Sequence, residues 1–126
     1  DLWRASEQRL RSPVRKLRTV RGRLTSDQFV LAGLSALSAY TMLAPPQIER
    51  YAVDATSWKG LVRELEVEEA WPGEEDVIEI ETWRYNPLPL VQDLIADRIS
   101  LYLSIRDNPD ERVELAAEQL LEPFEW

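Results

Sequence analysis

The residues with the clearest potential for chemistry are Glu79 and Glu81, two glutamates separated by one residue in the stretch VIEIETWRY. Alternation along an extended strand puts both side chains on one face, roughly 6–7 Å apart. Two carboxylates at that spacing could share a divalent cation, as in metal-dependent nucleases or nucleotidyltransferases, with Asp54 as a third candidate ligand. No lysine follows at the spacing of a restriction-type nuclease core, and no Gly-Ser pair precedes the glutamates. We therefore keep this enzyme as the alternative to a binding function.

The composition removes most other catalytic mechanisms. The chain has no histidine, the commonest general base and zinc ligand, and no cysteine for a disulfide or a thiolate metal site. Its four glycines, at positions 22, 33, 60 and 73, are isolated, so there is neither a P-loop nor a GxGxxG motif. We expect a non-catalytic protein that needs no cofactor. The lack of cysteine favours a cytoplasmic location, and no apolar run reaches the roughly 20 residues of a membrane span.

Charge is unevenly distributed along the chain. Residues 1–24 carry eight basic and two acidic side chains, a net charge of +6, whereas residues 25–126 carry seven basic and 21 acidic ones, a net charge of −14. An acidic body repels phosphate, but the basic leading segment could approach a DNA duplex, or it could simply be attracted to the acidic body within the fold. The candidate DNA-contacting residues are Arg11, Arg15, Lys16, Arg18, Arg21 and Arg23.

Three aromatic residues, Trp58, Trp83 and Tyr85, are candidates for a ligand pocket or a contact with a partner. They come from separate predicted elements, so packing in the core explains them more simply. If they do form a pocket, Trp58 and Trp83 would line it and the domain would sense a small molecule.

The candidate site residues are positioned by a small set of predicted strands and helices. Alternation predicts a strand over 77–85, with Glu79, Glu81 and Trp83 on one face and Ile78 and Ile80 on the other. The pattern favours an α/β (α+β) fold in which a small mixed sheet is packed by a buried central helix and two C-terminal helices. The other predicted elements are a short helix at 2–10, an exposed or edge strand at 14–20, the central helix at 29–43, a strand at 48–53, and helices at 58–67, 94–105 and 108–121.

Three stretches carry a resemblance to a known family. The helix LAGLSALSAYTML, which contains Ser35-Ala36-Leu37, is followed by Pro-Pro and the strand IERYAV. Further on comes the stretch VQDLIADRISLYLSIRDNPDERVELAAEQLLE, and the chain opens with DLWRASEQRLRSPVRKLRTV. The first two resemble the C-terminal domain of AbiEi-type antitoxins and of related bacterial winged-helix regulators, and the opening resembles the edge of a winged-helix module. The glycine usual after the Ser-Ala-Leu helix is replaced by Thr41-Met42.

The resemblance implies a bacterial transcription regulator or antitoxin of a toxin–antitoxin system. Residues 1–24 would be a basic linker or the edge of a winged-helix module, and residues 25–126 an α/β domain that binds a partner or an effector. DNA would be bound through an upstream or N-terminal region, and the partner would be a protein, in the antitoxin case a cognate nucleotidyltransferase-like toxin. We expect no membrane partner, and a homodimer is a further expectation.

Overall fold

A five-stranded mixed sheet forms the centre of the computed structural model, which describes residues 11–90 and 93–124. The strand order is β2-β3-β5-β1-β4. Strands β3 and β5 are parallel, and each of the other neighbouring pairs is antiparallel. The prediction of a small mixed sheet in an α+β fold is therefore confirmed. The strands are β1 (Val14–Arg21), β2 (Val30–Leu31), β3 (Arg50–Asp54), β4 (Glu68–Glu69) and β5 (Ile78–Trp83).

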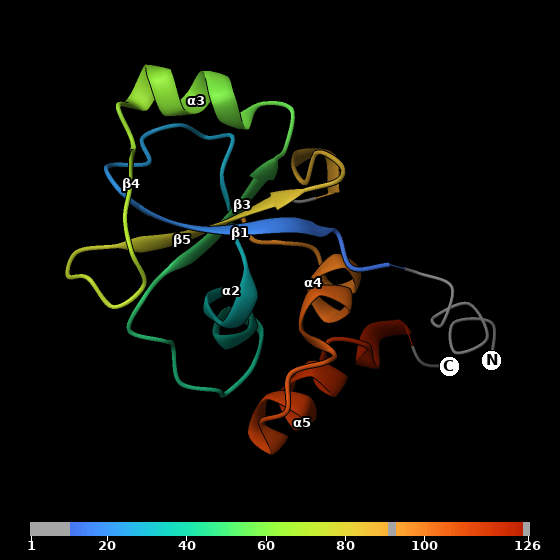
Figure 1. Cartoon of the computed structure of the whole chain (residues 1–126). Helices are drawn as coiled ribbons and strands as arrows, with labels where there is room; N and C mark the ends of the chain where they lie inside the picture. Colours follow the sequence, from blue (N-terminus) through green and yellow to red (C-terminus); the bar gives the residue numbers. More distant parts are fainter. Residues whose placement is uncertain (1–10, 91–92, 125–126) are drawn as a thin grey trace.

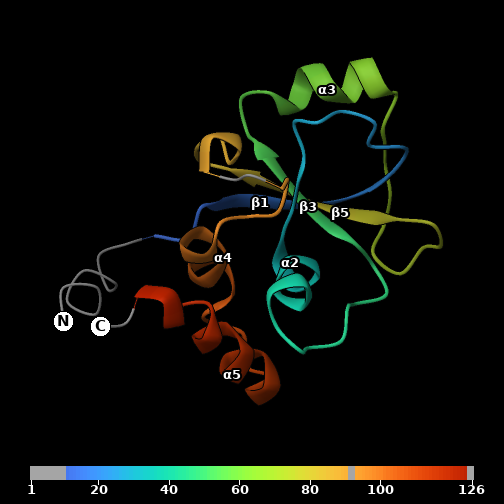
Figure 2. The ribbon, with the colours of Figure 1, turned by 180° about the vertical axis from the view of Figure 1, so that it is seen from behind.

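Helices cover both faces of the sheet, as Figures 1 and 2 show from opposite sides. One face, here called the α2 face, packs against α2, α4 and α5 around the buried side chains of Ala52 and Trp83. The other, the α3 face, packs against α3 around Val20, Val53 and Ile80. The helices are α2 (Gly33–Tyr40), α3 (Trp58–Leu65), α4 (Arg98–Ile105) and α5 (Glu111–Gln119), with short 3-10 turns at Leu88–Leu90 and Glu122–Phe124.

The central helix α2 is buried as predicted but is shorter than the predicted range 29–43. Residues Val30 and Leu31 are extended and pair with β3. Leu31 also donates its N–H to the carbonyl of Leu94 (2.7 Å) and accepts from the N–H of Ala96 (2.8 Å). A short apolar run is compatible with a buried strand as well as with a buried helix. Here the run is extended because Val30 and Leu31 pair with β3 on one side, and Leu31 forms backbone hydrogen bonds with the Leu94–Ala96 segment on the other.

Residues 14–20 were expected to lie in a basic segment that precedes the α/β domain. In the structure, these residues form β1, which lies between β5 and β4 in the sheet of that domain. Strand β1 pairs with β5 from Val14 opposite Trp83 to Val20 opposite Ile78. On its other edge, β4 pairs only with Val20 and Arg21. The first part of β1 therefore has a described neighbour on one edge alone. The predicted helix at 2–10 and the start of the 1–24 segment lie outside the described residues.

The last two helices begin later than the pattern predicts. Leu94 has a positive φ of 56° and Ile95 bridges to Leu31, so α4 starts at Arg98, where Asp97 caps it by accepting from the N–H of Ser100. Similarly, the cap of α5 is Asp110. Capping carboxylates satisfy N–H groups that a helix start leaves free. In the described part of the chain, no helix combines the length and apolarity needed to cross a membrane.

Candidate functional site

The carboxylates of Glu79 and Glu81 lie on one face of β5, as predicted. Both form an ion pair with the same arginine, Arg50. The guanidinium of Arg50 contacts Glu79 (Nη2 to Oε1, 3.1 Å) and Glu81 (Nη1 to Oε2, 3.3 Å). The indole N–H of Trp83 donates to the other oxygen of Glu81 at 2.9 Å. Arg50 reaches both carboxylates because its strand runs parallel to β5 with Arg50 opposite Glu79. This cluster joins β3 to β5.

Burial dominates the chemistry of Glu81, whose side chain is 3% exposed. It raises the pKa of the Glu81 carboxyl, because a charge in a poorly solvated site is disfavoured, while the Trp83 hydrogen bond and Arg50 oppose the rise. The third candidate ligand, Asp54, instead accepts from the N–H of Thr56 (3.1 Å) in the turn after β3. Among the described residues, no group of three or more potential metal-ligating side chains comes together.

The three candidate aromatic residues do not share a pocket. Trp83 is fully buried on the α2 face, where its ring meets that of Tyr85 edge to face at 5.7 Å. The Tyr85 hydroxyl and the Ser100 hydroxyl are 2.6 Å apart, which ties the segment after β5 to α4. Trp58 packs on the α3 face, against Phe29. The expectation of a pocket lined by both Trp58 and Trp83 is therefore wrong, because the sheet separates them.

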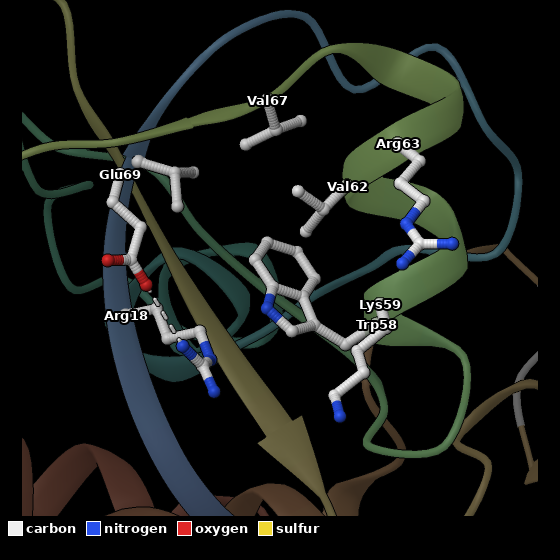
Figure 3. A pocket seen from close by; sticks show the side chains of 8 residues that line it. Arg18, Trp58, Lys59, Val62, Arg63, Val67 and Glu69 are labelled. Carbon is white, nitrogen blue, oxygen red and sulfur yellow. Dashed lines mark hydrogen bonds and ion pairs between the residues drawn. The ribbon is translucent and has the colours of Figure 1, made fainter.

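Trp58 does line a cleft of its own, between α3 and β1 (Figure 3). The cleft consists of two adjoining hollows of about 350 and 470 Å³, which share Arg18, Trp58 and Lys59. We call both together the Trp58 cleft. The first hollow is lined by Arg18, Val20, Trp58, Lys59, Val62, Arg63, Val67 and Glu69. The second is lined by Arg15, Lys16, Arg18, Ala55, Trp58, Lys59 and Thr82.

Helix α3 and strand β1 each supply cations to the rim of this cleft. The apolar side of α3 holds Trp58 and Leu61 against the sheet. Lys59 and Arg63, one helical turn apart, line the cleft from α3 (Figure 3). Lys16 and Arg18 line it from β1. The cleft therefore has an apolar floor and a basic rim.

The rim is nearly uniform in charge. Its basic residues are Arg15, Lys16, Arg18, Lys59 and Arg63. Among the described residues that line the cleft, Glu69 is the one acid. The chain as a whole carries a net charge of −8, whereas the residues that line this cleft carry a net positive charge. Clustered like charges raise the local concentration of an oppositely charged ligand.

Arg18 is the residue at the centre of the cleft. Its guanidinium lies over the Trp58 ring, 5.8 Å from the ring centroid, and its Nη1 contacts Glu69 at 3.1 Å. Its Nε is buried and has no hydrogen-bond partner among the described residues. A buried N–H without an acceptor is costly, so this Nε offsets part of the energy gained by placing the guanidinium over Trp58.

The candidate DNA-contacting residues separate into two groups. Arg15, Lys16 and Arg18 gather in the Trp58 cleft. Arg21 contacts Glu74 at 3.8 Å and donates to the carbonyl of Glu75, and Arg11 and Arg23 are exposed outside the cleft. Sequence reasoning missed the two cations of α3, Lys59 and Arg63. Their spacing of four residues beside Trp58 was the signal that could have found them.

Comparisons of this chain with protein-family models, with curated proteins and with solved structures find no match. The resemblance to AbiEi-type antitoxins therefore rests on the quoted sequence stretches alone. The strongest structural support for a function is the charge and shape of the Trp58 cleft.

Proposed function

We propose that this chain is a non-catalytic recognition domain of a bacterial DNA-binding regulator of the antitoxin type, and that its Trp58 cleft binds an acidic segment of a protein partner. The observation that carries the proposal is the gathering of five basic side chains around Trp58 on an otherwise acidic chain. The family context, including a cognate toxin as the partner, comes from the sequence resemblance, and the proposed cytoplasmic location comes from the lack of cysteine.

Carboxylates suit this cleft chemically. Arginine offers a planar fork of donors that matches a carboxylate, and lysine adds a point charge on a flexible stem. The floor formed by Val20, Trp58, Val62 and Val67 would accept apolar parts of the same segment. A segment in which acidic and apolar side chains alternate would use both properties.

A single chain segment fits the surroundings better than a DNA duplex does. Glu64, Glu66 and Glu68 are exposed along α3 and β4, close to the basic rim in the sequence. A duplex carries one charge per about 1.7 Å of its axis, so docking it here would bring phosphates near these glutamates. We therefore assign DNA recognition to an upstream or N-terminal region, in which exposed Arg11 and Arg23 could take part.

A binding role also fits the state of the strand carboxylates better than the alternative metal-dependent nuclease or nucleotidyltransferase does. Glu79 and Glu81 already have Arg50 as their cationic partner, and Glu81 is nearly enclosed. A metal ion would have to displace that guanidinium. Calorimetry with Mg²⁺ and Mn²⁺ provides the check, because tight binding that is lost in Glu79→Gln would favour the enzyme.

Fluorescence anisotropy tests the proposed function. A fluorescein-labelled peptide in which Glu alternates with Val is titrated with the protein at about 50 and 200 mM salt, and a labelled DNA duplex serves as the competing ligand. We expect the peptide to bind more tightly than the duplex, and its binding to weaken as salt rises. Reversing one rim charge in Lys59→Glu should weaken peptide binding about tenfold, equivalent to about 1.4 kcal/mol.

The matched control is Arg112→Glu. Arg112 lies on α5, against the opposite face of the sheet, and its side chain is highly exposed. The same change of net charge at that position should leave peptide binding nearly unchanged. Equal losses in the two variants would indicate a general charge effect and would contradict a site at the Trp58 cleft, as would tighter binding of the duplex.

A further inference from the structure

Among the described residues, part of one edge of β1 has no partner strand beside the cleft; we call it the open edge. Strand β4 pairs only with Val20 and Arg21, and the N–H of Ala70 donates to the carbonyl of Thr19 at 2.9 Å. The chain then turns away at Trp71 and Pro72. Residues two apart on a strand direct their backbone groups to the same edge, so Leu17 points its N–H and carbonyl toward the edge where Thr19 meets Ala70. Within residues 11–90 and 93–124, no strand pairs with Leu17 on that edge.

A groove of about 300 Å³ follows this open edge. It is lined by Lys16, Leu17, Arg18, Thr19, Glu69, Ala70, Trp71 and Pro72. Two large apolar side chains stand exposed along it, Leu17 (45% exposed) and Trp71 (78% exposed). An exposed tryptophan beside unpaired backbone groups is a suitable anchor for a docked segment. Arg18 lines both this groove and the Trp58 cleft, so the two adjoin at that residue.

The neighbours that β1 already has are acidic strands. Opposite Val20 and Arg21 stand Glu69 and Glu68 of β4. On the other edge, β5 has the sequence IEIETW. Strand β1 itself, VRKLRTVR, has four basic residues and no acidic one. Glu79 and Glu81 of β5 stand opposite Thr19 and Leu17 and contact Arg50. On the β4 side, by contrast, Arg18 contacts Glu69 at 3.1 Å, so charge complementarity favours an acidic strand along the edge that β4 begins to cover.

The same charges argue against a second copy of the chain at this edge. Pairing β1 with another β1 would bring Arg15, Lys16 and Arg18 of one copy near the same residues of the other. Like charges across a strand pair are destabilising, and basic residues are a common protection against edge-to-edge association. The open edge is thus unfavourable for self-pairing and favourable for an acidic strand.

We propose that the partner protein adds an extended segment with alternating acidic and apolar residues to this edge, antiparallel to β1 as a continuation of β4. This inference rests on the proposed function, because it states how the partner's acidic segment is held. Residues of the added strand opposite Lys16 and Arg18 share the α3 face, and they place their carboxylates at the Trp58 cleft. Residues opposite Leu17 lie on the other face and are apolar.

Backbone N-methylation distinguishes an added strand from a segment held by charge alone. In an antiparallel pair, the residue opposite Leu17 directs its N–H toward β1, whereas the residue opposite Arg18 directs its N–H away. In the alternating Glu-Val peptide, a valine lies opposite Leu17 and directs its N–H toward β1. A glutamate lies opposite Arg18 and directs its N–H away from β1. The probes are therefore the unmodified peptide, a version N-methylated at its valines and a version N-methylated at its glutamates.

Anisotropy with the wild-type protein should show binding of the unmodified peptide and of the version methylated at glutamate. Methylation at valine should weaken binding about tenfold or more, because hydrogen bonds to β1 are lost. Trp71→Ala should also weaken binding, whereas the control Leu115→Ala, which removes another exposed apolar side chain on α5, should not.

The outcomes separate this inference from the proposed function. Equal binding of the two methylated peptides, still weakened by Lys59→Glu, would overturn the added strand and leave the acidic-segment function standing. Binding that is lost on methylation at valine but unaffected by Lys59→Glu would support the strand and contradict the cleft. A failure of all the peptides to bind would contradict both proposals.

Discussion

Arg50 is the cationic partner of the buried Glu81 carboxylate. Its guanidinium contacts Glu79 and Glu81, and Glu81 is almost fully enclosed. Removing one partner of a buried ion pair leaves the other charge unpaired in a poorly solvated site. The Arg50–Glu79–Glu81 cluster therefore holds β3 and β5 in register as a unit, which gives both glutamates a structural role.

Arg50→Met should lower the free energy of unfolding by about 3–5 kcal/mol, the usual cost of an uncompensated buried charge. Urea denaturation followed by tryptophan fluorescence measures this change. Adding Glu81→Gln to the same protein should restore part of the loss, because the enclosed charge is then removed. Single and double variants of equal stability would contradict a role for charge.

Glu81 should also make stability depend on pH. Burial raises its pKa in the folded state above the ordinary 4.5, so the folded protein binds this proton more strongly than the unfolded chain does. Its stabilising contribution is complete below pH 4.5 and is lost as the pH rises through the folded-state pKa. The stability of Glu81→Gln relative to wild type should therefore rise with pH over that window. Urea titrations across pH measure it, and a constant difference would contradict the assignment.

Gly33 is required by its backbone and by Arg50. Its φ is +54°, and a Cβ at this position would lie 2.5 Å from Cδ of Arg50, which two carboxylates hold in place. Gly33→Ala should destabilise the fold by about 1–2 kcal/mol. Gly60, inside α3, provides the control, because its Cβ would meet no atom within 4 Å. Gly60→Ala should instead stabilise by up to about 1 kcal/mol, and thermal unfolding would show the opposite signs.

At the scale of elements, local patterns predicted those whose faces alternate or repeat clearly. The two faces of β5 are as predicted, with Ile80 toward α3 and Trp83 toward α2. Helix α3 begins at Trp58 as expected and ends two residues early, at Leu65, because Glu66 adopts a left-handed conformation. Such elements are determined mainly by their own side chains, and tertiary contacts adjust only their ends.

Elements that depend on distant partners could not be predicted from local pattern. Phe29–Leu31 reads as helix, yet Leu31 lies between β3 and the Leu94–Ala96 segment. The strand predicted at 14–20 is present as β1, and its first part is exposed with one edge unpaired among the described residues, as predicted. Its pairing with β5, a strand far along the chain, could not be predicted from the local pattern. In both cases the deciding hydrogen bonds join residues that are tens of positions apart.

The candidate site shows the same limit. Sequence reasoning named Arg15, Lys16, Arg18 and Trp58 but assigned the cations to DNA and the tryptophan to a pocket shared with Trp83. Only the fold shows that β1 and α3 face each other and join these residues in one cleft. The two faces of the sheet then decide which aromatic residue belongs to the site.

At the scale of the whole molecule, the two faces of the sheet are covered to different extents. The α2 face carries the larger core, in which three helices cover Ala52 and Trp83. The α3 face is covered by one short helix (Figure 1), and the Trp58 cleft lies beside that helix (Figure 3). We therefore assign stability mainly to the α2 face and recognition to the α3 face and the open edge of β1.

The most direct measurement is a map of backbone and indole N–H chemical shifts by ¹⁵N NMR during titration with the alternating Glu-Val peptide. We expect changes at the basic rim, along β1 and at the Trp71 indole, with the largest at Arg18, Lys59 and the Trp58 indole and with α5 unchanged. Changes centred on α5 or on the buried Trp83 indole, or no change at saturating peptide, would contradict binding of an acidic segment at the Trp58 cleft.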